Sequence, residues 1–276
     1  MGTHLAALEP RRIETAARSD TGRVRDENQD FCAEFEASDA SRLLVVADGM
    51  GGHSAGGLAS RVAVAAIGEV FRKGGGSPEE LLKRAFGEAN ARVHFLGAKE
   101  PFGMGTTAVA LLLRSDGAWV AHVGDSRAYR WRAGSLERLT EDHSWVFQEV
   151  AQGRMTAEQA VHHPRRNALV RTIGLDPEVP VEVARLEVAP GDRALLCSDG
   201  LWHELDEKIL ADALWMKPAE CVRHLVELAN LAGGHDNITA VVVRVPEIQG
   251  RRRHAIVWPV LAAVVVLASV AHWCGT

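Results

Sequence analysis

The sequence predicts an α+β fold in which antiparallel sheets are flanked by α-helices. Two observations favour this class over a doubly wound parallel sheet. Segments with strand character follow one another across short turns, as in hairpins, and segments with helix character come as neighbours along the chain. The chain has 276 residues, which is enough for one large domain with a sizeable buried core.

The first predicted elements are a buried strand and two consecutive helices, which follow an N-terminal tail at residues 1–12. The Val- and Leu-rich run at 43–49 is typical of a buried strand. Small and apolar residues recur at helical spacing over 58–71, and the glycines at 74–76 end that helix. A second helix begins after Ser77, where Ser-Pro-Glu-Glu forms a capping box with Pro at the first helical position. Its apolar face comprises Leu81, Leu82, Ala85, Phe86, Ala89 and Val93.

A β-hairpin is predicted in the middle of the chain. Residues 106–113 and 118–123 have strand character, and Asp116-Gly117 between them is a common hairpin turn. A short strand at 128–131 follows and ends at the Ala133-Gly134 turn. This run of strands is the main reason to expect antiparallel sheets.

Residues 140–178 differ in character from the segments on either side. They are polar and rich in His and Arg, with one short helix near 156–161. We interpret this stretch as a flap over a functional site. The regular patterns then resume, as strands at 181–188 and 194–197, a helix at 219–231 and a closing strand at 238–245. The predicted domain therefore spans residues 13–245.

The overall composition excludes several classes of function. A net charge of -5 and a pI near 6.2 give no basic surface for nucleic acid. The four cysteines lie far apart, without the spacing of a zinc site, and fit a reducing cytoplasmic compartment. The N-terminus has no apolar stretch long enough for a secretory signal peptide.

The C-terminus has the pattern of a membrane anchor. Residues 255–273 carry no charge and would span roughly 28 Å as a helix, close to the thickness of a bilayer core. A basic linker at 246–254 contains three consecutive arginines, and Trp258 and Trp273 stand near the two ends of the apolar segment. The alternative is a buried terminal helix, although helices in protein cores usually keep a polar stripe. We predict one transmembrane helix, which would hold the preceding domain on the cytoplasmic face of the membrane.

Four aspartates stand at positions where a carboxylate is costly to bury. Asp48 and Asp199 are each followed by Gly at the end of an apolar run, and Asp236 precedes another apolar run. Asp30 closes a polar segment that begins at Arg25. A buried carboxylate needs a partner or a bound cation. Oxygen ligands suit Mg²⁺ or Mn²⁺ better than Zn²⁺, so the set predicts an acidic metal pocket.

Such a pocket is suited to phosphoryl chemistry. Two ions about 4 Å apart can share a bridging water, lower its pKa and stabilise an in-line displacement at phosphorus. Arg25 stands five residues before Asp30 and supplies a guanidinium that can hold a phosphate. The alternative is that each Asp only caps a turn, because Asp-Gly is an ordinary turn pair. That alternative explains one aspartate easily and the whole set poorly.

Seven short segments carry a more specific signal. They are 21–30 (TGRVRDENQD), 46–53 (VADGMGGH), 103–107 (GMGTT), 123–127 (VGDSR), 139–144 (LTEDHS), 196–201 (LCSDGL) and 234–239 (GHDNIT). In this order they resemble the bacterial metal-dependent protein phosphatases, also called type 2C serine/threonine phosphatases, over roughly residues 15–245. The resemblance implies a four-layer αββα sandwich of two antiparallel β-sheets with helices outside. It also implies a two-metal centre in a cleft at one end.

The resemblance implies a role for each acidic residue. Asp48 would bridge the two ions, and the Gly49 carbonyl would bind one of them. Asp199 and Asp236 would ligate the other ion, and Asp30 would hold metal-bound waters. The expected reaction is hydrolysis of phosphoserine or phosphothreonine by metal-activated water, without a phosphoenzyme.

Two further roles and two departures come from the same resemblance. Arg25 would grip the phosphate, and Asp125 would bind a weaker third metal ion together with Asp199. Gln29 stands where the family often has Glu, so one acidic contact around the metal centre is lost. Met50 stands where eukaryotic members place a His that is proposed as the general acid, which leaves the proton donor open.

Three other interpretations compete with this one. Residues 52–56 (GHSAG) match the nucleophile elbow of serine hydrolases, although the elbow requires its Ser at the sharp turn that leaves a strand. The loop histidines, among them His143 and His235, suggest a transition-metal site, although scattered histidines are more often solvated. A pseudophosphatase that serves as a binding module would have no chemical need for the intact acidic set.

We therefore predict a membrane-tethered cytoplasmic serine/threonine phosphatase that opposes protein kinases. Its cofactors would be two Mn²⁺ or Mg²⁺ ions, with a third at the weaker site. Its expected partners are phosphorylated proteins, a Ser/Thr kinase with its targets, and the lipid bilayer around residues 255–273. No nucleic-acid partner is expected.

Overall fold

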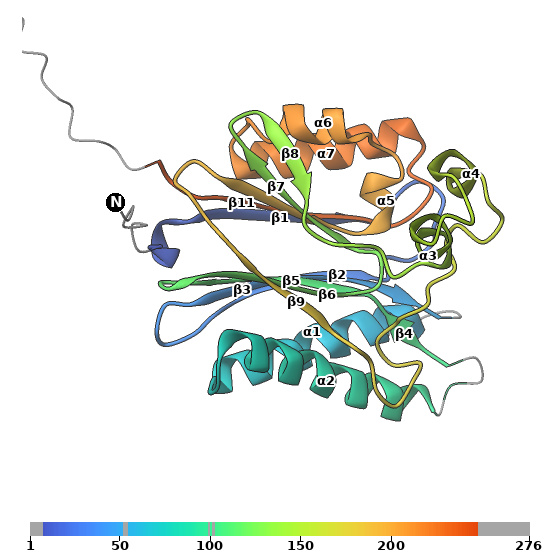
Figure 1. Cartoon of the computed structure of the whole chain (residues 1–276), viewed down its shortest axis with the longest axis horizontal. Coiled ribbons are helices and arrows are strands. Elements are labelled where there is room, and N and C mark those ends of the chain that lie inside the picture. The colour runs from blue at the N-terminus through green and yellow to red at the C-terminus, as the bar shows by residue number, and fades with distance from the viewer. Residues whose placement is uncertain (1–7, 52–54, 99, 101–102, 248–276) are drawn as a thin grey trace, which may run out of the picture.

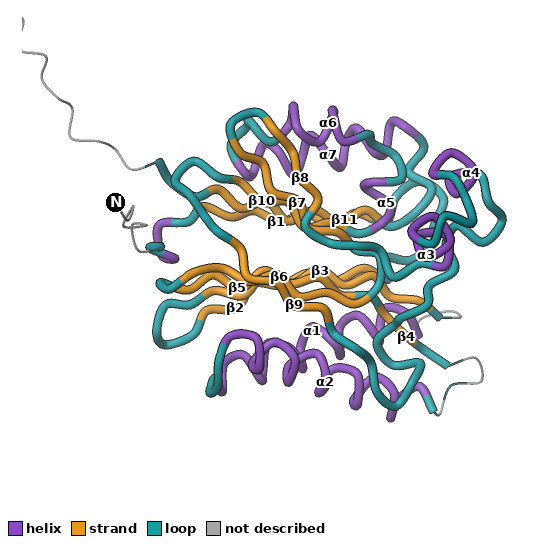
Figure 2. Tube along the Cα trace, viewed as in Figure 1, coloured by secondary structure: helices purple, strands orange, loops and turns teal. Residues whose placement is uncertain are grey.

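The structure is a computed structural model and describes residues 8–51, 55–98, 100 and 103–247. Two antiparallel β-sheets pack face to face, and α-helices cover the outer face of each sheet (Figure 1). Figure 2 shows the resulting order of layers, which is helix, sheet, sheet, helix. The predicted α+β fold with two antiparallel sheets flanked by helices is confirmed.

The first sheet has five strands in the order β1-β11-β10-β7-β8, and every neighbouring pair is antiparallel. Its strands are β1 Glu14–Asp20, β7 Arg127–Arg132, β8 Ser135–Arg138, β10 Arg193–Cys197 and β11 Ile238–Arg244. The helices on this side are α5 Asp199–Trp202, α6 Glu207–Ala213 and α7 Pro218–Ala232. A 3-10 turn at Pro10–Arg12 leads into β1.

The second sheet has the order β2-β3-β5-β6-β9, and the short strand β4 pairs with the end of β3. Its strands are β2 Asp30–Glu36, β3 Arg42–Met50, β4 Gly105–Thr106, β5 Ala108–Arg114, β6 Gly117–Val123 and β9 Glu182–Leu186. Two long helices, α1 Ala55–Lys73 and α2 Pro78–Gly97, cover its outer face (Figure 1). The predicted capping box is present at the start of α2, where the Glu80 carboxylate accepts a hydrogen bond from the Ser77 backbone N–H at 2.8 Å.

Both faces of the inner strands are buried, which explains their uninterrupted apolar sequences. In β3, Leu43 and Val45 belong to the core under the helices α1 and α2. Leu44 and Val46 belong to the core between the two sheets. Alternate side chains of a strand point to opposite faces, so a strand placed between two apolar layers must be apolar at every position.

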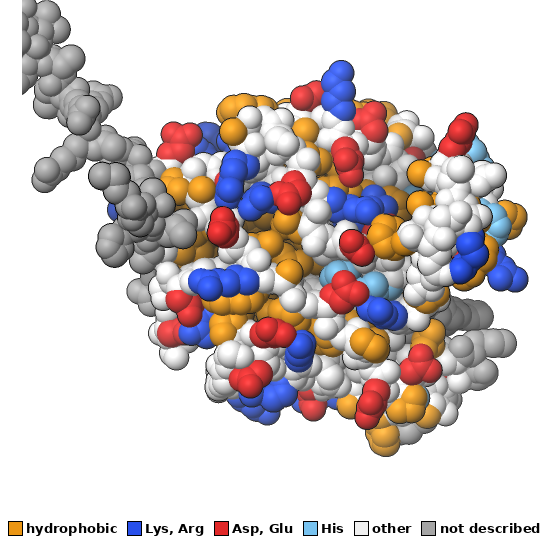
Figure 3. Space-filling model, viewed as in Figure 1, with side chains coloured by type: hydrophobic (Ala, Val, Ile, Leu, Met, Phe, Trp, Pro, Cys, Tyr) orange, Lys and Arg blue, Asp and Glu red, His pale blue; other side chains and the backbone are white. Residues whose placement is uncertain are grey.

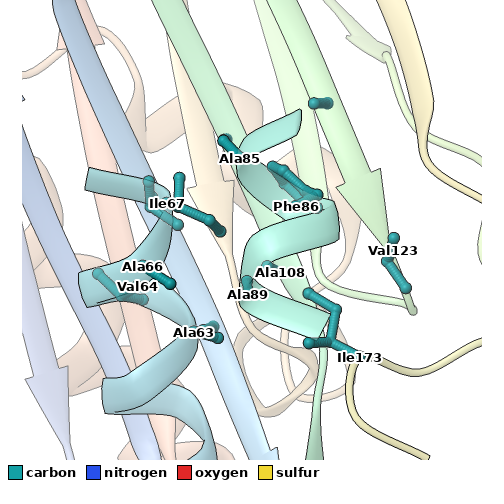
Figure 4. Close-up of a cluster of buried hydrophobic side chains, with 14 of the residues drawn as sticks. Ala63, Val64, Ala66, Ile67, Ala85, Phe86, Ala89, Ala108, Val123 and Ile173 are labelled. Atoms are coloured by element: carbon teal, nitrogen blue, oxygen red, sulfur yellow. The ribbon is translucent and has the colours of Figure 1, made fainter. Parts of the chain in front are cut away.

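The core between the second sheet and its helices is closely packed (Figure 4). Ile67 of α1 and Phe86 of α2 are both fully buried there. Burial of each such side chain contributes about 1.5–3 kcal/mol to stability. The surface is different: on the face seen in Figure 3, Lys and Arg side chains are interspersed with Asp and Glu, which limits the local electrostatic potential.

The segment between β8 and β9 lies at one end of the sandwich, on the right in Figure 1. It contains α3 Trp145–Ala151 and α4 Ala157–Val161, of which only α4 matches a predicted helix. The parts of this segment before α3 and after α4 form its two arms, and a β-bridge between Ser144 and Leu169 joins them. We call residues 140–178 the flap, as in the sequence analysis.

Several predicted elements differ from the observed ones. The strands β1, β2 and β8 were missed, and each lies at the edge of its sheet, where side chains meet solvent and the apolar pattern is weak. The predicted strand at 106–113 is divided into β4 and β5. Asp48 lies inside β3, which continues to Met50, and Asp199 is the first residue of α5. The Asp-Gly pairs had suggested that each aspartate ends a strand, and this prediction is wrong for both.

The predicted transmembrane helix at 255–273 lies outside the described residues, as do residues 248–254 of the linker. Among the helices that the structure describes, none has both the length and the apolar character needed to cross a membrane.

Candidate metal centre

A cleft of about 570 Å³ opens at the flap end of the sandwich. Its lining includes six of the residues predicted from the sequence, namely Arg25, Asp48, Gly49, Asp125, Asp199 and Asp236. The seventh, Asp30, lies behind the lining and is only 4% exposed. Asp48 belongs to the second sheet, whereas Asp199 and Asp236 flank strands of the first sheet. The cleft is thus built where the ends of both sheets meet.

The position of Asp48 is fixed through its backbone and its neighbours. Its carbonyl accepts hydrogen bonds from Thr107 N at 2.8 Å and Thr106 Oγ1 at 2.7 Å, and its N–H donates to Thr107 Oγ1 at 3.1 Å. In the antiparallel register of β2 and β3, Asp48 is directly opposite Asp30. A Cβ on Gly49 would lie 2.0 Å from the Gly56 carbonyl oxygen, so only Gly permits this close approach of β3 to α1.

Asp199 and Asp236 flank two adjacent strands of the first sheet. Asp199 follows β10 and Asp236 precedes β11, and these strands are antiparallel neighbours, so both residues lie at the same end. A Cβ on Gly200 would lie 2.2 Å from the Asn237 carbonyl oxygen, so the two loops touch through a position that only Gly fits. Arg25 Nη2 donates a hydrogen bond to Asp236 Oδ2 at 2.6 Å.

A hydrogen bond connects Asp30 of the second sheet to the residue before Asp199 in the first sheet. Ser198 Oγ donates to Asp30 Oδ2 at 2.6 Å, and the same hydroxyl accepts a hydrogen bond from Thr239 N at 3.0 Å. Ser198 therefore ties the start of β2 to the ends of β10 and β11. This contact holds Asp30 beneath the cleft.

The electrostatics of the cleft are those of crowded carboxylates. Burial raises the pKa of Asp30 to about 7, even though hydrogen bonds to its carboxylate act in the opposite direction. Burial, together with repulsion from Asp30 and Asp199, raises the pKa of Asp48 well above its usual range. Burial and repulsion from Asp199 do the same for Asp125. The folded chain thus concentrates negative charge at a cost to its own stability.

The polar atoms of this cleft are also incompletely satisfied. Among the described residues, Asp30 Oδ1 and Asp199 Oδ1 are buried and accept no hydrogen bond. A native protein rarely leaves a carboxylate oxygen without a partner, so these atoms indicate an external ligand. All the converging donors are oxygen atoms, which fits hard divalent cations such as Mg²⁺ and Mn²⁺.

Asp125 lies in the turn between β6 and β7, beside the acidic cleft. The Asp125 carbonyl accepts a hydrogen bond from Trp202 Nε1 at 3.1 Å. The Trp202 ring in turn stacks on the Arg127 guanidinium, with 3.4 Å between the guanidinium carbon and the ring centroid. The backbone of Asp125 is therefore held by a residue of α5, the helix that begins at Asp199.

A second groove of about 870 Å³ adjoins the cleft. The two share Asp125, Asn167 and Asp236, and the groove continues between the flap and α5. Its walls include apolar side chains of α3 and α4. The flap segment predicted from the sequence thus borders the acidic cleft.

Several residues that shape the site had no predicted role. Asn237 accepts a hydrogen bond from Gln29 N and donates to the carbonyls of Thr21 and Glu27, which fixes the loop that carries Arg25. Thr107 supports Asp48, as described above. Both residues lie inside segments that had been singled out, but a sequence pattern does not show which side chains face the backbone of a distant loop.

The competing interpretations find little support in the geometry. Residues 52–54 of the nucleophile-elbow motif lie outside the described residues, and the strand before them, β3, is antiparallel to both of its neighbours. The elbow belongs to parallel α/β sheets, so this context is wrong for a serine hydrolase. His235 is paired with Glu204 at 2.7 Å rather than with another histidine. His143 does lie beside His122 and Glu182, away from the acidic cleft lining.

Comparison with known proteins agrees with this geometry. The family model for protein phosphatase 2C matches residues 22–231. The serine/threonine phosphatase stp of Listeria welshimeri is 37% identical over 235 residues, which is 82% of this chain and 93% of that protein. The serine/threonine protein phosphatase PstP of Mycobacterium tuberculosis is 39% identical over 234 residues, which is 83% of this chain and 44% of PstP.

Solved structures give the same result. The Streptococcus agalactiae serine/threonine phosphatase superposes with a TM-score of 0.80 at 34% identity, over 84% of this chain and 99% of that one. The catalytic domain of PstP in complex with two manganese ions superposes with a TM-score of 0.74 at 36% identity, over 85% of this chain and 99% of that one. The chain belongs to the protein phosphatase 2C family of serine/threonine phosphatases.

Proposed function

We propose that the acidic cleft hydrolyses phosphoserine and phosphothreonine in proteins with two Mn²⁺ or Mg²⁺ ions. One observation carries this proposal: carboxylates from both sheets converge in one cleft, and two of their buried oxygens have no hydrogen-bond partner among the described residues. The manganese-bound relative of the same fold supports the choice of ion.

The geometry suggests how the ligands are divided. Asp48 lies directly opposite Asp30 in the β2–β3 register, and Asp30, Asp125 and Asp199 all repel its carboxylate, which fits a ligand that bridges two ions. Gly49 would contribute its carbonyl, and Asp199 and Asp236 would complete the other ion, as the sequence suggests. Asp125 would hold the weaker third ion. When bound, the ions would activate a water molecule as nucleophile and neutralise the charge of the phosphate.

Arg25 is placed to orient the substrate. Its side chain is 56% exposed at the mouth of the cleft, and Nη2 is anchored to Asp236 by the 2.6 Å contact. The hydrogen bond to Asp236 raises the pKa of Arg25, so the guanidinium stays charged. The remaining N–H groups can engage the phosphate oxygens of an incoming phosphoprotein.

A phosphatase assay tests the reaction. Turnover of a phosphothreonine peptide should require Mn²⁺ and should be abolished by a chelator and by Asp199→Asn. Activity that resists the chelator but is blocked by a serine-reactive phosphonate would instead indicate a serine hydrolase. Intact Mn²⁺ binding without turnover would indicate a binding module.

We further propose that residues 255–273 tether the enzyme to the cytoplasmic membrane, with the catalytic domain on the cytoplasmic side. The uncharged sequence and its flanking arginines and tryptophans support this. The substrates would then be phosphoproteins of a Ser/Thr kinase at that surface, and a substrate-trapping pull-down from membranes would identify them. Release of the full-length protein from membranes by carbonate would exclude the tether.

A further inference from the structure

His143 lies where the two arms of the flap meet the loop that carries Asp125. His143 lies in the arm before α3, and its carbonyl accepts a hydrogen bond at 2.8 Å from Val170 N in the arm after α4. Its backbone N–H donates to the Gly124 carbonyl at 3.0 Å. The side chain is only 5% exposed. One residue therefore contacts both arms of the flap and the neighbour of Asp125.

The two ring nitrogens of His143 have different partners. Nδ1 accepts a hydrogen bond from Gly124 N at 3.1 Å, so Nδ1 must carry a lone pair. In the neutral ring the proton is then on Nε2, which lies 3.0 Å from Glu182 Oε1 of β9. Arg171 Nη1 also donates to Glu182 Oε1, at 2.7 Å. Arg171 Nη1 also lies 3.2 Å from Nε2. The Gly124 N–H needs a lone pair on Nδ1 and the Glu182 carboxylate accepts from Nε2, so these two contacts select the neutral tautomer with its proton on Nε2.

The same cluster has the spacing of a metal site, but its protons are wrongly placed. The possible ligand atoms of His122, His143 and Glu182 lie within 4.8 Å of one another. For His143 Nε2 to bind a metal, Nδ1 would have to carry the proton, and that proton would face the Gly124 N–H. Nε2 of His122 lies 2.8 Å from the Glu141 carbonyl oxygen, which calls for a proton there too. The cluster is therefore a hydrogen-bond junction.

The surroundings keep this junction neutral. The His122 ring stacks on His143 with 4.6 Å between the ring centroids. Burial and the neighbouring His122 lower the pKa of His143 to about 4. The lone pair that holds Gly124 is thus available at physiological pH.

We propose that His143 is a positioning residue that couples the flap to the metal ligand Asp125. Nδ1 fixes the Gly124 N–H and hence the Gly124–Asp125 turn. Nε2–H holds the Glu182 carboxylate of β9, which in turn accepts a hydrogen bond from Arg171 of the flap. This inference rests on the proposed role of Asp125 at the third ion. Coupling is reciprocal, so an ion at Asp125 restrains the flap, and a restrained flap strengthens binding of that ion.

Two variants separate the two nitrogens. In His143→Asn the amide oxygen replaces Nδ1, so the Gly124 contact is kept and the Glu182 contact is lost. In His143→Gln the longer side chain replaces Nε2, so the Glu182 contact is kept and the Gly124 contact is lost. His143→Leu removes both contacts, and Asp125→Asn serves as the control that removes the ion ligand but leaves the junction intact.

The first measurement is Mn²⁺ binding by calorimetry, with thermal unfolding to establish that each variant is folded. Wild type should bind a third, weaker Mn²⁺ ion. His143→Gln and His143→Leu should weaken that ion about 10-fold or more, whereas His143→Asn should stay close to wild type and the two tight ions should be unaffected. If wild type binds only two ions, or if His143→Leu binds the third as wild type does, the proposal is wrong.

The second measurement is trypsin cleavage of the flap at its exposed arginines, Arg154, Arg165 and Arg166. Mn²⁺ at the weak site should slow cleavage in wild type, and this protection should disappear in His143→Leu and in Asp125→Asn. Equal protection in His143→Leu and wild type would overturn the coupling. Phosphopeptide turnover by wild type is measured in parallel, so a failure of the proposed function is recognised separately from a failure of the coupling.

Discussion

Two clusters of charged side chains lie near each other at the flap end of the molecule. In one the carboxylates lack partners, and in the other the charges are paired. In the acidic cleft, Asp30, Asp48 and Asp199 face one another, and two of their oxygens accept no hydrogen bond within the described part of the chain. In the adjoining cluster, Asp142 accepts two hydrogen bonds from Arg127, at 2.9 and 2.6 Å, and Trp202 stacks on that guanidinium.

The difference separates a ligand site from a scaffold. The Arg127–Asp142 ion pair has its hydrogen bonds within the protein, so it contributes to the stability of the folded state without a ligand. The carboxylates of the cleft repel one another, and a bound cation would relieve this repulsion. Both clusters place charged side chains at least partly out of solvent. They differ in whether the polar atoms have partners within the described part of the chain, and this difference separates a ligand site from a structural ion pair.

Removing a charge from the acidic cleft should have the largest effect, and it should fall on activity. We expect Asp48→Asn to lower kcat/KM for a phosphothreonine peptide by about 1,000-fold or more, about 4 kcal/mol of transition-state stabilisation. The metal-free variant should be at least as stable as wild type, because one repulsive charge is gone. Asp116→Asn, in an exposed hairpin turn, is the matched control and should change neither quantity appreciably. A clear drop in metal-free stability of Asp48→Asn would contradict the comparison.

The same substitution in the paired cluster should act on folding. Asp142→Asn leaves the Arg127 guanidinium buried without its counter-charge, since the two side chains are only 13% and 8% exposed. We expect a loss of about 3 kcal/mol in the free energy of unfolding, measured by urea denaturation. The double variant Arg127→Met/Asp142→Leu should recover much of this loss. If Asp142→Asn is neutral, the pair does not stabilise the scaffold.

Metal addition should stabilise the protein through the cleft alone. At a free Mn²⁺ concentration of about 100 times Kd, binding adds about 2.7 kcal/mol for one site, and a chelator should remove this gain. Thermal unfolding with and without Mn²⁺ measures it. Asp142→Asn should gain as much as wild type, whereas Asp48→Asn should gain far less. Equal gains in both variants would show that Mn²⁺ binds elsewhere.

The smallest expected effect is a pH dependence from the histidine junction. The pKa of His143 falls from about 6.5 in the unfolded chain to about 4 in the folded protein, where it faces His122, Glu182 and Arg171. Between these pH values the unfolded chain binds the extra proton, so the free energy of unfolding falls as pH falls from 6.5 to 4.

The size of this loss is on the order of 2 kcal/mol. The measurement is the difference between wild type and His143→Asn, because the contributions of the carboxylates then largely cancel. Burial acts to raise the pKa of Glu182, but the hydrogen bonds from Arg171 and His143 outweigh it and lower that pKa below its usual value. A difference that does not change between pH 6.5 and 4 would show that His143 is free to take up the proton in the folded protein.

The sequence alone predicted the inner strands and a candidate ligand set. A strand such as β3, between a helix layer and a sheet, must be apolar at every position, and this pattern is local and easily read. Gly49 and Gly200 were visible as Asp-Gly pairs, and the ordered segments around them indicated a phosphatase. The edge strands β1, β2 and β8 were missed because one side of each faces solvent, so a short polar sequence can still pair with its neighbour.

Only the tertiary structure decided which groups meet and which remain unsatisfied. Asp30 and Ser198 are 168 positions apart, yet their hydrogen bond joins the two sheets beneath the cleft. His143 meets Gly124 and Glu182 because β6, β9 and the arms of the flap converge. Such contacts depend on how strands are ordered in space, and no local pattern of residues records that order. The sequence therefore identified the candidate ligands, and folding determined which of them lie together and which contacts hold them.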